Sequence, residues 1–252
     1  MPESISYSII MPVYNGRNYF PEALTSAISA ITSDDEIIVV EDGSTDGGVA
    51  EFIPQQPNIR YFRKENGGVA SALNEGLSKA AKKYFCWLSH DDIYLPDRLS
   101  SDRRLRRYAP NVITASSFYL LYQDTGTIRG VNIEKFQRSN YRLALLSKRF
   151  LNGNCLTAPI ESIKQCGMFD EQLKHTQDYD LWMTLSMTHD FLFLGEKTVI
   201  SRQHANQDSV TGHKVAKKEW WNICKKHKGE LIIKRPKDIY YLLNLLYMLL
   251  RP

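Results

Sequence analysis

The sequence predicts an α/β fold in which a mostly parallel sheet is flanked by helices. One observation is the run Glu36-Ile37-Ile38-Val39-Val40, which is typical of a parallel strand covered on both faces. The other is the alternation of short apolar segments with segments whose apolar residues recur every three or four positions. Strand–helix–strand repetition with short connections indicates right-handed crossovers between parallel strands.

The elements of the first half follow in a regular order. Pro12 lies near the end of the first strand, at a position where a strand stops pairing. After Asn15-Gly16, apolar residues at helical spacing predict a helix from Phe20 to Ile31. A second helix is expected from about Gly68 to Ala81. We expect strands at 7–13, 36–40, 59–62 and 84–88.

The second half is less regular. A helix with a very basic outer face is expected from Pro96 to Arg107, and Asp124-Thr125-Gly126 indicates a hairpin. Leu181 and Leu185 line another helix, and one or two helices follow Lys214. Further strands are expected at 112–122, 127–131, 156–160, 191–194 and 198–201. We treat 1–213 as one domain and 214–252 as a basic, amphipathic helical extension.

Composition limits the class of protein. The 252 residues, 43% hydrophobic and 24% charged, are enough for a sizeable core and exclude a disordered tail or a disulfide-stapled mini-protein. Residues 214–252 contain 10 Lys and Arg against 3 Asp and Glu, whereas 1–213 contain 22 against 25. A mildly acidic body with a basic end indicates an anionic partner near the C-terminus. No nucleic-acid motif accompanies the positive charge, so we expect no nucleic acid as partner.

Cellular location is inferred from what the sequence lacks. The four cysteines have no CxxC spacing, which favours a reducing compartment. Met1 to Ile5 has neither a basic region nor the start of a long apolar run, as a cleaved signal requires. The longest apolar stretch, 239–250, is interrupted by Asn244 and is shorter than the about 20 residues of a membrane-spanning helix. We expect a cytoplasmic protein that does not cross the cell membrane, and peripheral contact with its inner face is the option that the basic end leaves open.

The first two strands end in polar sequence, where open α/β sheets bind ligands. After the first strand, Tyr14 follows either as part of an ordinary turn or as an aromatic face for a base. After the second strand, Glu41 and Asp42 can accept hydrogen bonds from uracil or thymine N–H and from ribose hydroxyls. A helix cap by Ser44 or Thr45 explains one hydroxyl but not two carboxylates. The segment has neither a Walker A lysine nor the GxGxxG spacing of a dinucleotide site.

The next two strand ends suggest phosphate and metal. Asn66-Gly67-Gly68 either lets a phosphate reach backbone N–H groups or simply starts a helix, and the two interpretations are balanced. Asp91 and Asp92 suit Mn²⁺ or Mg²⁺ bridging to phosphate oxygens, although either can instead cap the turn toward Leu95.

Two later residues complete the candidate site. Asp178 lies in the first turn of the helix that carries Leu181, where a carboxylate complements the helix dipole or serves as a general base. His204 follows the last strand and completes a metal site only if the fold brings it to Asp92.

Together these strings resemble the family 2 glycosyltransferases of the GT-A fold. The matching strings occur in the family's order over roughly residues 5–210. They are Ile10-Met11-Pro12-Val13-Tyr14-Asn15, Val40-Glu41-Asp42-Gly43-Ser44-Thr45-Asp46, Asn66-Gly67-Gly68, Leu88-Ser89-His90-Asp91-Asp92, and Phe169-Asp170-Glu171 followed by Gln177-Asp178-Tyr179-Asp180-Leu181-Trp182.

The resemblance implies an inverting, metal-dependent transfer of a sugar from a nucleoside diphosphate donor, with uridine favoured. The acceptor would be a hydroxyl of a glycan or lipid-linked molecule in cell-surface polysaccharide synthesis. Asp91 would lie near ribose or phosphate, Asp92 and His204 would hold Mn²⁺ or Mg²⁺, and Asp178 would deprotonate the acceptor. The nucleoside would be held by Pro12, Tyr14, Glu41 and Asp42, with Asn66 and Gly68 on the nucleotide as well.

The sequence departs from the family pattern at four positions. Glu41 replaces an aspartate, Ser89 replaces the first aspartate of the DxD-type run, Leu73 replaces an arginine, and Gln177 replaces a glutamate. They leave a catalytically silent nucleotide-sugar-binding or assembly subunit as the alternative function.

The extension has two interpretations of its own. Its lysines, with Trp220, Trp221 and the apolar run to Leu250, fit an interfacial helix on an anionic membrane. Alternatively, it packs on the domain or forms a homodimer contact.

Overall fold

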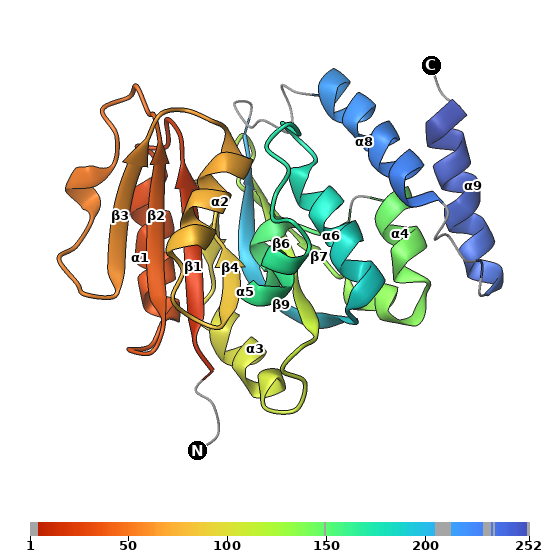
Figure 1. The fold of residues 1–252 in the computed structure, drawn as a ribbon, viewed down its shortest axis with the longest axis horizontal. Coiled ribbons are helices and arrows are strands. Elements are labelled where there is room, and N and C mark those ends of the chain that lie inside the picture. Colours follow the sequence, from red (N-terminus) through yellow and green to blue (C-terminus); the bar gives the residue numbers. More distant parts are fainter. Residues whose placement is uncertain (1–4, 149, 205–212, 229–232, 234, 251–252) are drawn as a thin grey trace.

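The computed structural model describes residues 5–148, 150–204, 213–228, 233 and 235–250 (Figure 1). Met1 to Ser4, where no cleaved signal segment is expected, lie outside this range. Residues 205–212, near the end of the proposed domain 1–213, also lie outside it.

The first half forms the expected parallel sheet. Strands β3, β2, β1 and β4 are neighbours in that order, and all three pairs are parallel. Pro12 lies beyond Ile10, the last β1 residue paired with β4, so its missing N–H leaves no bond of that ladder unmade. Their bounds are β1 Tyr7–Val13, β2 Glu36–Asp42, β3 Ile59–Lys64 and β4 Tyr84–Trp87, which confirms the four predicted strands.

The second half extends the same sheet with mixed pairing. Strand β8 (Leu156–Pro159) is antiparallel to both β4 and β6 (Ile113–Tyr122). The hairpin of β6 with β7 (Thr127–Val131) is confirmed. Strand β5 (Ile93–Tyr94) pairs antiparallel with β9 (Phe191–Gln203), which is parallel to β6.

Strand β9 corrects one prediction, because the expected strands 191–194 and 198–201 are a single element. Ser116 pairs with Leu194 and Ser117 with Lys197, so Gly195 and Glu196 are accommodated as a bulge that does not end the strand. The result is that β9 reaches from the α6 side of the molecule to the polar strand ends.

The predicted helices are present, with α2 in front of the sheet and α1 behind it in Figure 1. They are α1 Phe20–Ala30, α2 Val69–Lys79, α3 Arg98–Arg106 and α6 Gln177–Thr188. The sequence did not indicate the short elements η1 Ala50–Phe52, η2 Glu134–Arg138, α4 Tyr141–Ser147, η3 Gly153–Cys155 and α5 Ile160–Gln165. The strand expected to reach Ile160 ends one residue earlier, because α5 begins there.

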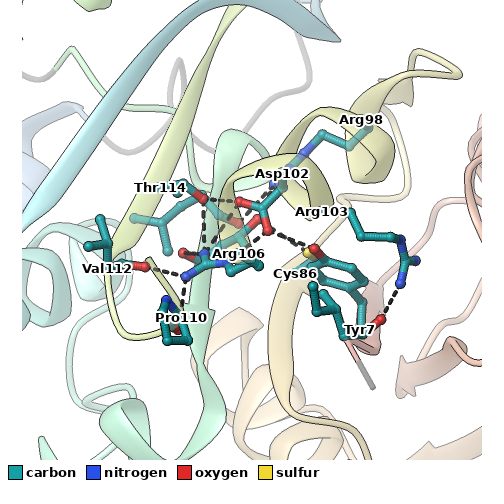
Figure 2. Close-up of polar contacts among 12 residues, drawn as sticks. Tyr7, Cys86, Arg98, Asp102, Arg103, Arg106, Pro110, Val112 and Thr114 are labelled. Carbon is teal, nitrogen blue, oxygen red and sulfur yellow. Dashed lines mark hydrogen bonds and ion pairs between the residues drawn. The ribbon is translucent and has the colours of Figure 1, made fainter. Parts of the chain in front are cut away.

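Helix α3 exposes Arg104, as the expected basic outer face requires, but two of its other arginines lie inside the protein. Arg98 and Arg106 are buried, and Figure 2 shows the network that holds them. Arg106 forms an ion pair of 2.9 Å with Asp102, which also accepts a 2.8 Å hydrogen bond from the Tyr7 hydroxyl. Burial, followed by the charge of Asp102, raises the pKa of Tyr7 far above its usual range. Buried charges that are paired in this way fasten α3 to β1 and β6.

The extension forms two helices that behave differently. In α8 (His213–His227), Trp220 is buried against Tyr179 with ring centroids 5.2 Å apart, so this helix packs on the domain. Trp220 therefore cannot enter a membrane as expected. Helix α9 (Pro236–Leu250) packs on α4, and its Leu245 is buried. Within the described ranges, no helix combines the length and the apolar character that crossing a bilayer requires.

Candidate active site

The loops after β1 and β2 are joined by Asn15. Its backbone N–H donates to the Ser44 hydroxyl at 3.1 Å, and its side-chain oxygen accepts from the Thr45 N–H at 2.8 Å. Asn15 has a φ of 49°, a left-handed conformation that asparagine tolerates better than most residues. Ser44 thus fixes the β1 loop instead of capping a helix, and the neighbouring Tyr14 ring is 46% exposed.

Asp42 connects the end of β2 with the start of α2. One carboxylate oxygen accepts from the Gly67 N–H at 3.0 Å and from Lys64 Nζ at 2.8 Å, and the other accepts from the Gly68 N–H at 2.7 Å. The structure therefore brings Asp42 and the Asn66–Gly68 segment together. The Gly68 N–H already has a partner in Asp42, so its contact with a phosphate stays a prediction.

Glu41 binds the loop after β2 and strand β3. Its side chain is fully buried and accepts from the Tyr61 hydroxyl at 2.5 Å and from the Val49 N–H at 3.1 Å. Burial, and then the bond to Glu41, raises the pKa of Tyr61 to about 12. A Cβ on Gly48 would lie 2.4 Å from the other Glu41 oxygen, and Gly48 has a φ of 72°, so only glycine fits. Glu41 thus shapes this loop, and its direct contact with a nucleoside stays a prediction.

Asp92 is held inside the protein. It accepts from the Arg202 backbone N–H at 2.8 Å and from the Asn154 side-chain amide. Burial, and secondly the charge of Asp91, raises the pKa of Asp92 well above its usual range.

His204 is brought to Asp91, and its contact with Asp92 stays a prediction. Its Nε2 lies 3.0 Å from Asp91 Oδ2, and its ring stacks on Tyr19 at 5.1 Å between centroids. A Cβ on Gly16 would lie 2.4 Å from the His90 ring, so the β1 loop also packs closely against the β4 end. The ends of β1, β4 and β9 therefore meet in one place.

Two residues of this site were missed by the sequence analysis. Arg202 is buried, donates to the Asp91 carbonyl at 2.9 Å and pairs with Glu22 of α1. Asn154 of η3 accepts from the Ser89 N–H at 2.7 Å while its amide donates to Asp92. Arg202 stands two residues before His204, which is a usable signal. Asn154 had none, because its role depends on where η3 lies.

Asp178 occupies the first turn of α6 as expected, and its carboxylate accepts from the Tyr179 N–H at 2.8 Å. The Tyr179 hydroxyl accepts from the Leu151 N–H at 2.8 Å, which ties α6 to the segment leading to Asn154. From α8, Glu219 accepts hydrogen bonds from the N–H groups of residues 174 and 175 at 2.8 and 3.0 Å. Glu219 therefore holds the segment before Asp178, and Tyr179 holds the helix that follows it.

Two surface hollows of about 430 and 450 Å³ lie elsewhere, on either side of the ion pair between Lys226 and Asp180. None of the predicted site residues lines either hollow. The candidate site is therefore built from the strand ends and not from these hollows.

Comparison with known proteins identifies the family. Residues 8–155 match the family described as glycosyl transferase family 2. The chain belongs to glycosyl transferase family 2. It is 36% identical over 247 residues to an uncharacterized glycosyltransferase of Rickettsia bellii, covering 94% of this chain but only 36% of that relative. It is 27% identical over 218 residues to the chondroitin synthase of Pasteurella multocida, covering 84% of this chain and 22% of that protein.

Solved structures confirm the GT-A fold of this family 2 chain. TarS of S. aureus in complex with UDP-GlcNAc matches with a TM-score of 0.75 and 17% identity, over 97% of this chain and 71% of that one. The mannosyltransferase PcManGT of Pyrobaculum calidifontis, in complex with GDP-Man and Mn²⁺, matches with a TM-score of 0.65 and 16% identity, over 96% and 69%.

The metal that this family resemblance implies can be tested against the donor atoms of the chain. Asp91 offers a carboxylate oxygen, the donor that Mn²⁺ and Mg²⁺ prefer, and His204 Nε2 lies 3.0 Å from it. In the described part of the chain, no group of three or more such side chains is placed to hold a metal. Two protein ligands fit an ion that takes its remaining ligands from phosphate and water. The role of Asp92 as a ligand stays a prediction, since both of its oxygens accept protein hydrogen bonds.

Proposed function

We propose that this chain is the catalytic part of an inverting hexosyltransferase. It would move a sugar from a nucleoside diphosphate donor to a hydroxyl of a glycan or lipid-linked acceptor in cell-surface polysaccharide synthesis. The observation that carries the proposal is the meeting of Asp91, His204 and Asp92 at the ends of β4 and β9, beside the β1 loop. Membership of the glycosyl transferase family supports the reaction class.

The donor is proposed to lie across the ends of β1 and β2. Tyr14 offers an exposed aromatic face beside Pro12, and Asp42 and Glu41 set the shape and charge of the adjacent loop. Asn66 and Gly68 would extend this surface toward phosphate, and Asp91 would meet ribose or phosphate. The UDP-GlcNAc complex of TarS supports uridine, and the name of the chondroitin synthase supports a polysaccharide product.

The departing diphosphate gains negative charge as the glycosidic bond breaks. The proposed Mn²⁺ or Mg²⁺, held by His204 and Asp91 or Asp92, would offset that charge. The Mn²⁺ complex of PcManGT supports a divalent cation. Arg202 holds the Asp91–Asp92 segment in position through its backbone N–H and its guanidinium.

Asp178 is proposed as the base. An ionised carboxylate at the first turn of a helix is favoured by the helix dipole and is rigidly held. It would accept the proton of the acceptor hydroxyl while that oxygen attacks the sugar on the face opposite the diphosphate. Inversion at the anomeric carbon follows from this single displacement.

The division of this chain into a domain and an extension is also a proposal. Residues 1–213 would form the transferase domain and 214–252 a helical extension, of which α8 packs on the domain. All four cysteines are free thiols, which supports a reducing, cytoplasmic location.

The test replaces Asp178 with Asn and measures hydrolysis of UDP-GlcNAc with Mn²⁺ alongside the thermal shift caused by UDP. We expect hydrolysis to fall at least about 100-fold while UDP still raises the melting temperature, since general-base catalysis contributes roughly that much. Asp190→Asn, at the opposite end of α6 and exposed, is the matched control and should change neither measurement.

The same assay decides between the two functions. Turnover that depends on Asp178 supports the enzyme. A protein that binds UDP but hydrolyses neither UDP-GlcNAc nor GDP-Man supports the silent subunit, which the departures at Ser89, Leu73 and Gln177 made conceivable.

A further inference from the structure

Helix α9 presents a continuous apolar stripe to solvent. Six large apolar side chains on this helix are between 43% and 80% exposed. Their spacing repeats every three or four residues, so they share one face of the helix. The stripe consists of Ile239, Tyr240, Leu243, Leu246, Tyr247 and Leu250.

The opposite face fixes the direction of the stripe. Leu245 and Asp238 are buried against the body of the protein, and α9 contacts α4. In Figure 1, α9 lies at the edge of the molecule, on the far side from β1, β2 and β3. The apolar stripe therefore points outward and does not serve the packing of this chain.

Four exposed basic residues lie at the N-terminal end of α9. Lys148 lies with its Nζ 3.2 Å from the Tyr240 hydroxyl and 4.9 Å from the centre of that ring. Arg235 donates to the carbonyl of Arg138, and Lys237 stands in the first turn of α9; all four basic residues are exposed.

The acidic residue of α9 does not neutralise this charge at the surface. Asp238 is fully buried, and its carboxylate accepts from the backbone N–H groups of Asn140 at 3.2 Å and Arg235 at 2.9 Å. The surface around the stripe is therefore both apolar and cationic.

We propose that α9 docks in the plane of an anionic lipid bilayer, with the apolar stripe in the interface and the four cations among lipid phosphates. Two tyrosines on the stripe suit the polar–apolar boundary of such an interface. The 15 residues of α9 span only about 22 Å, short of the about 30 Å of a hydrocarbon core, so the helix lies on the bilayer.

The charge distinguishes a bilayer from a second copy of this chain. In a symmetric dimer with parallel α9 helices, the cations beside one stripe would face those beside the other. In an antiparallel dimer they would meet the C-terminal half of the partner's α9, residues 243–250, which contains no acidic residue. An anionic surface instead attracts every one of them. None of these residues belongs to the candidate active site, so α9 can bind a bilayer whether or not the proposed reaction holds.

The test measures co-sedimentation of the full chain with vesicles. We expect binding at least about tenfold tighter to vesicles containing about 30% phosphatidylglycerol than to neutral phosphatidylcholine, and weaker binding at high salt. Replacing Leu243 and Leu246 with Gln should weaken binding by about tenfold or more, because the substitutions remove apolar area that would be buried in the bilayer. They leave the net charge unchanged. Lys237→Gln should weaken binding by about fivefold, through charge alone.

Ile128→Gln is the matched control, since Ile128 is 59% exposed on β7 and lies outside the stripe. Circular dichroism establishes that each variant is folded. Equal binding to neutral and anionic vesicles, or binding unaffected by the Leu243 and Leu246 substitutions, would overturn the proposal. A dimer that is broken by those substitutions, with no vesicle binding, would also overturn it.

Discussion

Asn154 binds Asp92 with its amide nitrogen and the Ser89 backbone N–H with its amide oxygen. One buried side chain therefore fixes both ends of the Ser89–Asp92 segment. The Asn154 side chain is itself held by Asn152, whose oxygen accepts from it at 2.9 Å. The positions of Asp91 and Asp92 thus depend on η3, an element far away along the chain.

Asn154→Ala should lower turnover by at least about tenfold and weaken UDP binding less, because the Asn154 side chain holds the Ser89–Asp92 segment and, among the described residues, forms no hydrogen bond with Tyr14 or Asp42. Initial rates of UDP-GlcNAc hydrolysis and UDP thermal shifts check this. Asn140→Ala is the matched control, since Asn140 caps α4 through a hydrogen bond to the Leu143 N–H. Both variants should lose about 1–2 kcal/mol of unfolding free energy, and only Asn154→Ala should lose activity. Equal activity in the two variants would contradict the positioning role.

Removal of divalent cations by a chelator should abolish hydrolysis, and Mn²⁺ should restore it. His204→Ala should raise the Mn²⁺ concentration required for half-maximal activity by at least about tenfold, because the nitrogen beside Asp91 is lost. A Mn²⁺ titration of activity measures this change. His189→Ala, at the C-terminal end of α6, should leave the titration unaltered. If both variants gave the wild-type titration, His204 would not be a metal ligand.

Asp102→Ala should destabilise the protein by about 3–5 kcal/mol, because Arg106 would be left as a buried charge without its carboxylate. Urea unfolding followed by circular dichroism gives the change in free energy. Arg104, also on α3, forms an exposed ion pair with Glu196 of β9. Arg104→Ala should therefore cost no more than about 1 kcal/mol. Similar losses for the two variants would mean that burial does not set the strength of these pairs.

Asp180 should make the docking of α8 sensitive to acid. Burial alone would raise the pKa of Asp180, but hydrogen bonding to His227 and Lys226 lowers it overall. Since the folded pKa lies below the unfolded value of about 3.9, the bridge stabilises the fold above that pH. This contribution is lost as the pH falls through the folded pKa.

Hydrogen exchange of the α8 amides, measured between neutral pH and about pH 3, follows this loss directly. In the wild type, protection should fall at the acid end of the series. Asp180→Asn should show reduced protection already at neutral pH and little further change with acid. Glu196→Gln, an exposed carboxylate, serves as control. An unchanged acid response in Asp180→Asn would assign the effect to other carboxylates.

The sequence predicted the elements whose pattern is local. Strands β1 to β4 are short apolar runs, and helices α1 and α2 repeat apolar residues every three or four positions. Once the strand ends are known, the polar residues that follow them can be listed. The contact of Asn15 with Ser44 and Thr45, and that of Asp42 with Gly67 and Gly68, join strings that were each visible by themselves.

What the sequence could not predict depends on tertiary partners. The burial of Arg106 depends on Asp102 and Thr114, which accept its hydrogen bonds. The burial of Arg98 depends on β8, where the Leu156 carbonyl and the Thr157 hydroxyl accept from it. His204 meets Asp91 because β9 continues through its bulge as far as Gln203, and that continuation was not predicted. Short elements such as η3 have too few residues to show a period, so Asn154 was not found.

The carboxylate of Glu219 links α8 to the segment just before Asp178. Because it accepts hydrogen bonds from the backbone of residues 174 and 175 and from the Thr176 hydroxyl, a chain truncated ahead of α8 would retain every proposed nucleotide-binding residue and yet lose the order of the segment that presents the proposed base. Recombination of residues 1–213 with foreign C-terminal segments would meet the same constraint. The proposed transferase domain would thus be completed by a helix that contributes no reacting group of its own.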